Sequence, residues 1–211
     1  MASPPNHSNR CRIVLTGGPG GGKTTAADLF RREIGDRVVI VPEAATLLFG
    51  GGFPRSREPH ALRSSQSAIY HVQRNLEDVQ SALYPSRILL CDRGTVDGAV
   101  YWPGNAPDDF FASQETTLEA ELARYEAVIF FESAAVGGIS IEGGNPVRNE
   151  SLREAIELDS RLRAVWSAHP RFVLVPHDRS FFHKMSAGLA ALEAVVKELG
   201  ELAEGGERSA P

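Results

Sequence analysis

Cysteine and long apolar runs are both scarce in this sequence. The two cysteines, Cys11 and Cys91, are too few for a disulfide framework or a cysteine-rich metal site, so we expect both to be small buried apolar residues. No stretch approaches the roughly 18 apolar residues of a membrane-spanning helix. The opening residues, MASPPNHSNR, lack the apolar core of a signal peptide. The sequence therefore predicts a cytoplasmic protein without a transmembrane segment.

An excess of positive charge is also missing. The chain has 22 Lys and Arg against 27 Asp and Glu, a formal net charge of −5. Proteins that bind nucleic acid usually present a basic face to the phosphates, so nucleic acid is not an expected partner. A local basic pocket for a phosphorylated ligand stays open.

Internal repeats and long linkers are absent too. Residues 1–10 are polar and contain proline, and residues 200–211 are rich in Gly and Glu, so we expect two disordered tails. The segment between them, 11–199, is long enough for one domain with a sizeable core.

Five short apolar runs punctuate this domain. Their lack of polar alternation is typical of strands that helices cover on both faces. The runs are RIVLT (12–16), RVVIVP (37–42), RILLCD (87–92), AVIFFE (127–132) and RFVLVP (171–176). Helical periodicity marks 23–34, 61–83, 150–168 and 181–199; it is clearest in 61–83, where an apolar stripe is expected from Leu62, Ile69, Val72, Leu76, Val79 and Leu83. The alternation predicts a doubly wound α/β domain that binds ligands at the carboxyl ends of its strands.

A glycine-rich loop joins the first strand to the first helix. Residues 17–24, GGPGGGKT, match the phosphate-binding pattern G-x-x-x-x-G-K-[ST]. Its glycines let backbone N–H groups point at phosphate oxygens, and the helix N-terminus adds its dipole. The expected nucleotide contacts, for ATP or alternatively GTP, are Gly18, Gly20, Gly21, Gly22, Lys23, Thr24 and Thr25. Thr24 is also an expected ligand of Mg²⁺.

Motifs of switches and motors are missing. A GTPase would carry N-K-x-D and a D-x-x-G after its third strand, but Asp92 is followed three residues later by Thr95. An AAA-type motor would carry an acidic pair where this chain has Asp92-Arg93. These absences favour phosphoryl transfer.

Charged residues follow the second and third strands. Phosphoryl transfer needs a carboxylate linked to magnesium and arginines on the phosphates, so we assign Asp92 to the metal and Arg93 to the phosphates. Asp92 could alternatively cap a helix. Glu43 is the candidate general base, with an ion pair to a nearby arginine or a cap as its alternative.

The segment 133–155 has the glycine pairs of a hinged lid. Such a lid excludes water and brings arginines to the γ-phosphate, so Arg148 and Arg153 are further catalytic candidates. Arg153 could instead pair with Glu157, four residues along the helix.

The predicted helix 61–83 also offers a set of polar side chains. Gln66, Tyr70 and Gln73 are spaced by four and three residues and are candidates for binding the acceptor. Trp102 is a candidate for stacking on it, or else a core residue.

Basic and acidic residues at two further places are candidates for ligand binding. Arg55, Arg57 and Arg63 are either a solvated cluster or the neutralising groups for a phosphorylated acceptor. Asp178 follows the fifth strand, where the donor's adenine is expected, and would otherwise cap the last helix near Ser180.

Several phrases together resemble a known family. TGGPGGGKTT, VPEAAT, SAIYHVQRNLED, CDRGTVDG and the stretch 153–185 resemble the AAA-type P-loop family that contains nicotinamide riboside kinase domains and TRPL translocation-defect-like proteins. The resemblance covers about residues 12–195. It implies a nucleoside-kinase-like sheet of five parallel strands, in the order 2-3-1-4-5, with a lid.

The sequence thus predicts an ATP- and Mg²⁺-dependent phosphotransferase for a nucleoside, nucleotide or related hydroxyl-bearing acceptor. One alternative is a nucleotide-regulated protein whose loop 53–63 contacts a protein or an anionic lipid. A second is a stand-alone ATPase. The acceptor, the choice between ATP and GTP, and the oligomeric state stay open.

Overall fold

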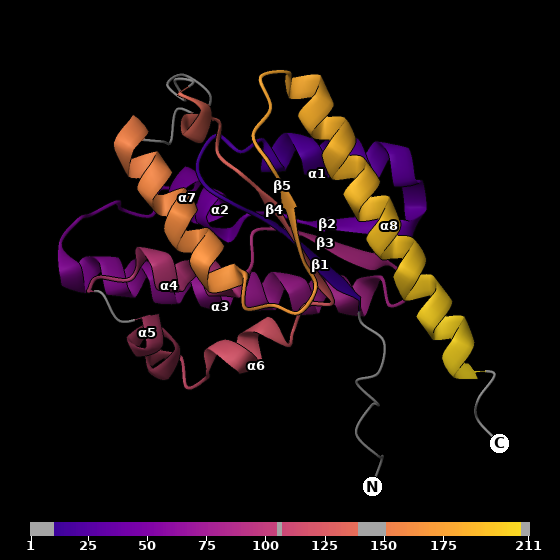
Figure 1. Ribbon diagram of the computed structural model, residues 1–211. Coiled ribbons are helices and arrows are strands. Elements are labelled where there is room, and N and C mark those ends of the chain that lie inside the picture. Colours follow the sequence, from indigo (N-terminus) through magenta and orange to yellow (C-terminus); the bar gives the residue numbers. More distant parts are fainter. Residues whose placement is uncertain (1–10, 105–106, 139–150, 208–211) are drawn as a thin grey trace, which may run out of the picture.

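Five parallel strands form one sheet in the order β2-β3-β1-β4-β5, which confirms the predicted topology (Figure 1). The computed structural model describes residues 11–104, 107–138 and 151–207. The strands are β1 (Arg12–Thr16), β2 (Val38–Val41), β3 (Ile88–Asp92), β4 (Ala127–Phe131) and β5 (Phe172–Val175). Each predicted apolar run forms a strand.

Helices cover both faces of this sheet (Figure 1). One face carries α1 (Lys23–Ile34) and α8 (Phe181–Glu207). On the other side lie α2 (Ala44–Gly50), α3 (Pro59–Leu83), α4 (Gly98–Tyr101), α5 (Pro107–Ser113), α6 (Leu118–Leu122) and α7 (Leu152–Trp166). Short 3-10 helices are η1 (Gly35–Arg37), η2 (Thr95–Asp97) and η3 (Ala134–Gly137). Successive residues of β1 alternate between two cores, with Ile13 and Leu15 toward α1 and α8 and Val14 toward the opposite face. This double coverage explains the uninterrupted apolar runs.

The register of the sheet positions the candidate site. Leu15 of β1 lies opposite Asp92 of β3, and Thr16 lies opposite Phe130 of β4. Parallel strands end at the same edge, so Asp92 stands beside the start of the glycine-rich loop.

The buried face of α3 is not the predicted apolar stripe. Val79 and Leu83, two members of that stripe, are 54% and 64% exposed. The buried residues of α3 are instead Ser65, Gln66, Tyr70, Gln73, Glu77 and Ser81. The other four stripe residues, Leu62, Ile69, Val72 and Leu76, are half-buried, and Leu76 packs against the core. Apolar periodicity thus located the helix but only part of its inner face, because polar side chains of that face find partners inside the protein.

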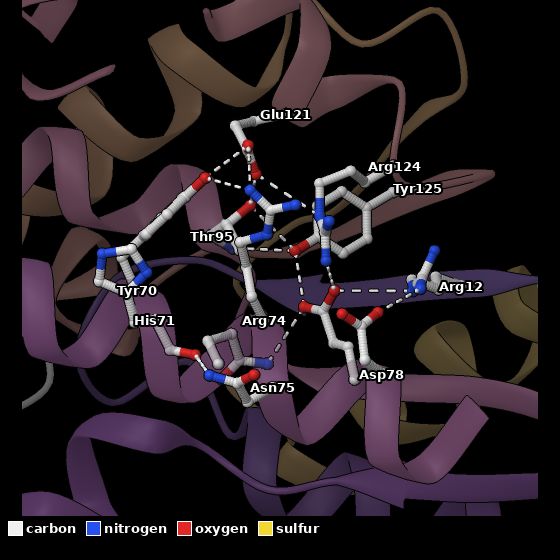
Figure 2. Close-up of polar contacts among 12 residues, drawn as sticks. Arg12, Tyr70, His71, Arg74, Asn75, Asp78, Thr95, Glu121, Arg124 and Tyr125 are labelled. Atoms are coloured by element: carbon white, nitrogen blue, oxygen red, sulfur yellow. Dashed lines mark hydrogen bonds and ion pairs between the residues drawn. The ribbon is translucent and has the colours of Figure 1, made fainter. Parts of the chain in front are cut away.

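Those partners form a buried network between α3, α6 and the residues before β4, which we call the α3 network (Figure 2). Its members are Arg12, Tyr70, Arg74, Glu77, Thr95, Glu121, Arg124 and Tyr125. Tyr70 donates its hydroxyl proton to Glu121 Oε1 at 2.7 Å, and Arg124 Nη2 lies 2.6 Å from Glu77 Oε2. The network fixes the inner face of α3 against the core.

The last helix is longer than predicted. It begins at Phe181 as expected but continues to Glu207, so part of the expected C-terminal tail is helical. The expected N-terminal tail, 1–10, lies outside the described residues.

The structure describes the two cysteines and the apolar character of the helices. Cys91 is buried and free, while Cys11 is free but only half-buried, and burial raises the pKa of Cys11 to about 12. Within the described part of the chain, no helix combines the length and apolar character needed to cross a membrane.

Candidate phosphate, metal and acceptor site

The loop between β1 and α1 has the backbone of a phosphate cradle. Gly20 and Gly22 have φ angles of 75° and 87°, which favour glycine. A Cβ on Gly21 would lie 2.7 Å from the carbonyl oxygen of Phe131, so no side chain fits there. Gly22 precedes α1 without a side-chain cap. The first N–H groups of α1 are therefore available to an anion.

Lys23 is folded back over this loop. Its Nζ donates to the carbonyl oxygens of Gly17 and Gly18, both at 2.8 Å, and the residue is only 4% exposed. Phosphate oxygens would compete with these carbonyls, because hydrogen bonds to charged acceptors are the stronger ones.

Thr24 and Asp92 come together as a magnesium site requires. Thr24 Oγ1 donates to Asp92 Oδ2 at 2.7 Å. Asp92 Oδ1 is buried and has no hydrogen-bond partner among the described residues. Burial and the nearby Glu43 raise the pKa of Asp92, against the opposing effect of Thr24 and Lys23. Such an unsatisfied carboxylate beside a hydroxyl suits Mg²⁺, which takes one or two protein oxygens and completes its shell with water and phosphate.

Arg93 is held between two carboxylates. Its Nε lies 2.5 Å from Glu43 Oε1, and its Nη1 donates to Asp97 Oδ2 at 2.6 Å. Its φ of 72° is unusual for a residue with a side chain. In this structure Arg93 thus contacts acids rather than lying free for a phosphate. The alternative foreseen for Glu43, an ion pair with a nearby arginine, is present.

The ion pair sets the charge of Glu43. Burial by itself would raise the pKa of this carboxyl, but Arg93 and the Thr46 hydroxyl bring the pKa below its ordinary value. Glu43 is therefore a carboxylate at neutral pH and can accept a proton from a bound hydroxyl.

Asp97 is a residue that sequence reasoning missed. It is 5% exposed, and its Oδ1 accepts hydrogen bonds from Thr16 Oγ1 at 2.8 Å and from Trp166 Nε1 at 2.6 Å. Its other oxygen holds Arg93. The available signal was the spacing of four residues between Arg93 and Asp97. Asp97 ties the end of β1 and the end of α7 to the Glu43–Arg93 pair.

A cavity of about 350 Å³ adjoins the loop at Pro19. Its wall comes from α2, the loop after α2, α3 and the segment after β3. Glu43 and Arg93 lie in this wall, and so do the acceptor candidates Gln66, Tyr70 and Gln73. The structure therefore gathers residues from four separate segments around one space next to the P-loop.

The three acceptor candidates differ in what their polar groups do. Gln73 accepts from the Ala44 amide and donates to the Arg93 carbonyl, both at 3.3 Å, so it braces the wall. The hydroxyl of Tyr70 belongs to the α3 network (Figure 2), which leaves its ring to line the cavity. Gln66 is 7% exposed, and its amide has no hydrogen-bond partner among the described residues. Of the three, Gln66 alone keeps its amide for a ligand.

With this geometry established, the comparisons with known proteins can be stated. A family model described as an AAA domain matches residues 12–180, from the start of β1 to the residue before α8. This chain belongs to the AAA domain family. The family has the P-loop NTPase fold, which agrees with the sheet order and with a nucleotide at the glycine-rich loop. No curated protein matches the sequence.

Two site predictions are not supported by the geometry of this AAA domain. Trp102 packs in the core with its ring centroid 5.4 Å from that of Phe110, since an apolar ring is better buried there, and its neighbour Tyr101 lines the cavity instead. Asp178 is exposed, and its Oδ1 accepts from the Ser180 amide at 2.7 Å. Asp178 therefore caps the approach to α8, the alternative foreseen for it.

The predicted lid is described only at its two ends. Arg148 and all of 139–150 lie outside the described residues. Arg153 is exposed in the first turn of α7, beside a capping box formed by Ser151 and Glu154. Thr25 is likewise exposed, one residue after Thr24 in α1.

A second acid that sequence reasoning missed accepts a hydrogen bond from the P-loop of this AAA domain. Asp159 of α7 is 3% exposed, and its Oδ1 accepts from the amides of Gly18 and Ser133, both at 2.8 Å. The Ser133 hydroxyl in turn donates to the Pro19 carbonyl. Asp159 thereby joins the P-loop, the end of β4 and α7.

Proposed function

We propose that this AAA domain is an ATP- and Mg²⁺-dependent phosphotransferase acting on a hydroxyl group of a small nucleoside, nucleotide or related acceptor. The observation that carries the proposal is the cavity beside the P-loop, with the Glu43 carboxylate in its wall. Hydrolysis alone needs space for one water molecule, whereas this cavity has the volume of a small-molecule site.

The donor's phosphates would lie on the P-loop. The N–H groups at the start of α1 and the ammonium of Lys23 would bind the β- and γ-phosphates. Thr24 and Asp92 would hold Mg²⁺, which supplies charge neutralisation at the phosphate oxygens when bound. The unpartnered Oδ1 of Asp92 supports this assignment.

The acceptor would react at the end of the cavity that contains Glu43. Its hydroxyl oxygen forms a bond to the γ-phosphorus, while the bond from that phosphorus to the bridging oxygen breaks and ADP leaves. The hydroxyl proton passes to a carboxylate oxygen of Glu43. A loose transition state places little demand on base strength, so the lowered pKa of Glu43 suits this role.

Recognition of the acceptor would fall to the wall formed by α3. The amide of Gln66 offers one acceptor and two donor hydrogens to the polar edge of a base or a similar group. Ile69 and the ring of Tyr70 supply apolar surface beside it. A wall side chain that hydrogen-bonds the ligand discriminates against ligands lacking the matching group.

The test is ADP formation from ATP, followed in a coupled assay over a panel of nucleosides, nucleotides and related hydroxyl compounds, with GTP as a second donor. We expect turnover that depends on one acceptor class, no turnover in Lys23→Ala, and slow transfer with unchanged ATP affinity in Glu43→Gln. Glu198→Gln on the far end of α8 is the control. Turnover that no acceptor changes would establish a stand-alone ATPase. Nucleotide-dependent binding to a protein or membrane without any transfer would establish the regulated binding protein.

A further inference from the structure

The cavity is elongated along α3. Its wall includes residues of α3 from Leu62 to Gln73, which are 11 residues apart. At 1.5 Å per residue this spans about 16 Å. Gln73 contacts the backbone of Ala44 and Arg93, so the Gln73 end is the end that contains Glu43. The Leu62 end lies at the first turns of α3, where the loop after α2 arrives.

That loop brings Arg55 into the wall at the second end. The guanidinium carbon of Arg55 lies 4.1 Å from the ring centroid of Phe49, which also lines the cavity. Stacking holds the planar group in place and leaves its N–H edge uncovered. No carboxylate or carbonyl of the described residues accepts a hydrogen bond from Arg55.

Arg57 adds a second guanidinium to the same end. Its Nη2 lies 3.4 Å from Glu154 Oε1 at the start of α7, and the Arg57 side chain is 83% exposed. Exposed ion pairs of this kind contribute little and exchange readily for another anion. Arg57 also belongs to the residues that line the cavity.

The charges of the cavity are therefore segregated. Its acids, Glu43 and Asp97, lie at the inner end and are both paired with Arg93. The wall at its outer end carries two guanidinium groups, and Glu154, which is not one of the lining residues, pairs with Arg57. A molecule with a neutral hydroxyl at one end and an anion at the other matches this order, whereas a cationic tail would meet repulsion.

We infer that the acceptor carries a phosphomonoester or carboxylate group at the end opposite its reacting hydroxyl, and that Arg55 and Arg57 bind this anion. Guanidinium groups bind both anions through paired N–H donors. The inference rests on the proposed function, since it specifies the chemical class of the molecule in the same cavity. The acceptor is a soluble small molecule, because the two arginines belong to a cavity wall that also holds the mostly buried residue Gln66.

Calorimetry with matched pairs of ligands tests this inference. The ligands are the 5′-monophosphates of adenosine, guanosine, cytidine and thymidine and the corresponding nucleosides, with the donor site saturated by a non-hydrolysable ATP analogue. We expect at least one monophosphate to bind ten-fold or more tightly than its nucleoside. Arg55→Gln should remove that difference and leave the affinity for the nucleoside and for the ATP analogue unchanged.

Arg32→Gln, an exposed arginine on α1, is the matched control and should keep the full difference. The Arg55 side chain is exposed, so its substitution should leave the thermal unfolding midpoint unaltered. Equal or absent binding of both members in every pair overturns the inference. If phosphoryl transfer to a nucleoside is then still observed, the proposed phosphotransferase stands without an anionic acceptor.

Two further comparisons, of binding with phosphoryl transfer and of soluble ligands with vesicles, distinguish the remaining outcomes. Monophosphate binding that depends on Arg55, without transfer under any condition, supports the anion site and overturns the proposed function. Sedimentation with phosphatidic acid vesicles, compared with phosphatidylcholine vesicles, examines a lipid source of the same phosphomonoester. Vesicle binding that requires Arg55, with no binding of soluble monophosphates, overturns the assignment to a soluble acceptor.

Discussion

Two groups of buried carboxylates in this domain differ in how completely the protein satisfies them. In the α3 network, Glu77 and Glu121 are 0% and 2% exposed, and both oxygens of each carboxylate accept hydrogen bonds. The Nε atoms of Arg12 and Arg124 are buried there without a hydrogen bond and lie 3.6 and 3.5 Å from the carboxylates of Glu77 and Glu121. At the P-loop, Asp92 is 4% exposed and one of its oxygens has no hydrogen-bond partner among the described residues. Because an unpaired buried oxygen is destabilising, the α3 network is suited to holding the fold, and the P-loop edge is suited to binding a ligand.

The largest expected effect would come from breaking the α3 network. Glu77→Ala removes the acid that Arg12 and Arg124 share, leaving Arg12 only the exposed Asp78 and Arg124 only Glu121 at 3.5 Å, and should lower the free energy of unfolding by about 3–5 kcal/mol. Denaturant titration measures this. Glu198→Ala, which removes an exposed ion pair with Arg171, should change it by less than about 1 kcal/mol. Equal effects of the two substitutions would show that the network does not hold the fold.

The opposite response is expected at the P-loop edge. Asp92→Asn removes a buried charge that the protein without nucleotide and metal does not fully pair. In the absence of these ligands the substitution should therefore raise the free energy of unfolding by about 0.5–2 kcal/mol. The same variant should lose about 10²–10³-fold in turnover, because the metal loses its carboxylate. Asp36→Asn, on an exposed acid, should change neither.

The rise in the free energy of unfolding caused by Asp92→Asn should depend on pH. The pKa of Asp92 is raised in the folded protein above its ordinary 3.8, so the folded state binds the proton more tightly than the unfolded state does. The advantage of Asp92→Asn is therefore complete above the folded pKa and disappears as the pH falls toward 3.8. Denaturant titrations at several pH values measure this difference in the free energy of unfolding between Asp92→Asn and the wild type. A difference that grows as the pH falls would contradict the prediction.

An intermediate effect is expected at Asp97, which links the two regions. Asp97→Asn should let Arg93 and Glu43 shift and lower kcat about 10²-fold, with little change in ATP affinity. In a Trp102→Phe background, the fluorescence of Trp166 reports the loss of its hydrogen bond to the carboxylate. Asp109→Asn on α5 is the control. Unchanged kcat with an altered Trp166 signal would make Asp97 a structural residue only.

The last expected effect concerns Lys184, whose Nζ donates to the Glu132 carbonyl near Asp159. Burial lowers the pKa of Lys184 from 10.5 to about 8. Between these pH values the unfolded chain binds the proton and the folded chain does not, so the free energy of unfolding rises with pH. The wild type should gain on the order of 2 kcal/mol relative to Lys184→Gln from pH 8 to 10.5. Denaturant titrations showing a constant difference would contradict this.

The fold was predictable because its signals are local. Each strand is an uninterrupted apolar run, and the P-loop is a continuous string between a strand and a helix. Thr24 and Asp92 could be paired in advance because parallel strands end at one edge. Trp102 could not be assigned, since a ring at that position packs equally well in a core or on a ligand.

Other features depended on partners distant in sequence. The orientation of α3 follows from Glu121 and Arg124, which lie far beyond that helix in the chain. Asp159 supports Gly18 across 141 residues, and Asp97 supports Thr16 across 81. No spacing pattern in the sequence marks either acid as a partner of the P-loop.

The sequence by itself determined the five strands and the phosphate cradle, because periodicity and glycine spacing act within one or two elements, and the family resemblance implied the order of the strands. Only the tertiary structure decided that Arg93 lies between Glu43 and Asp97, that α3 buries several polar side chains, and that Arg55 and Arg57 line the same cavity as Glu43. These outcomes depend on which side chains share a buried space, and the packing of all the helices against the sheet sets that.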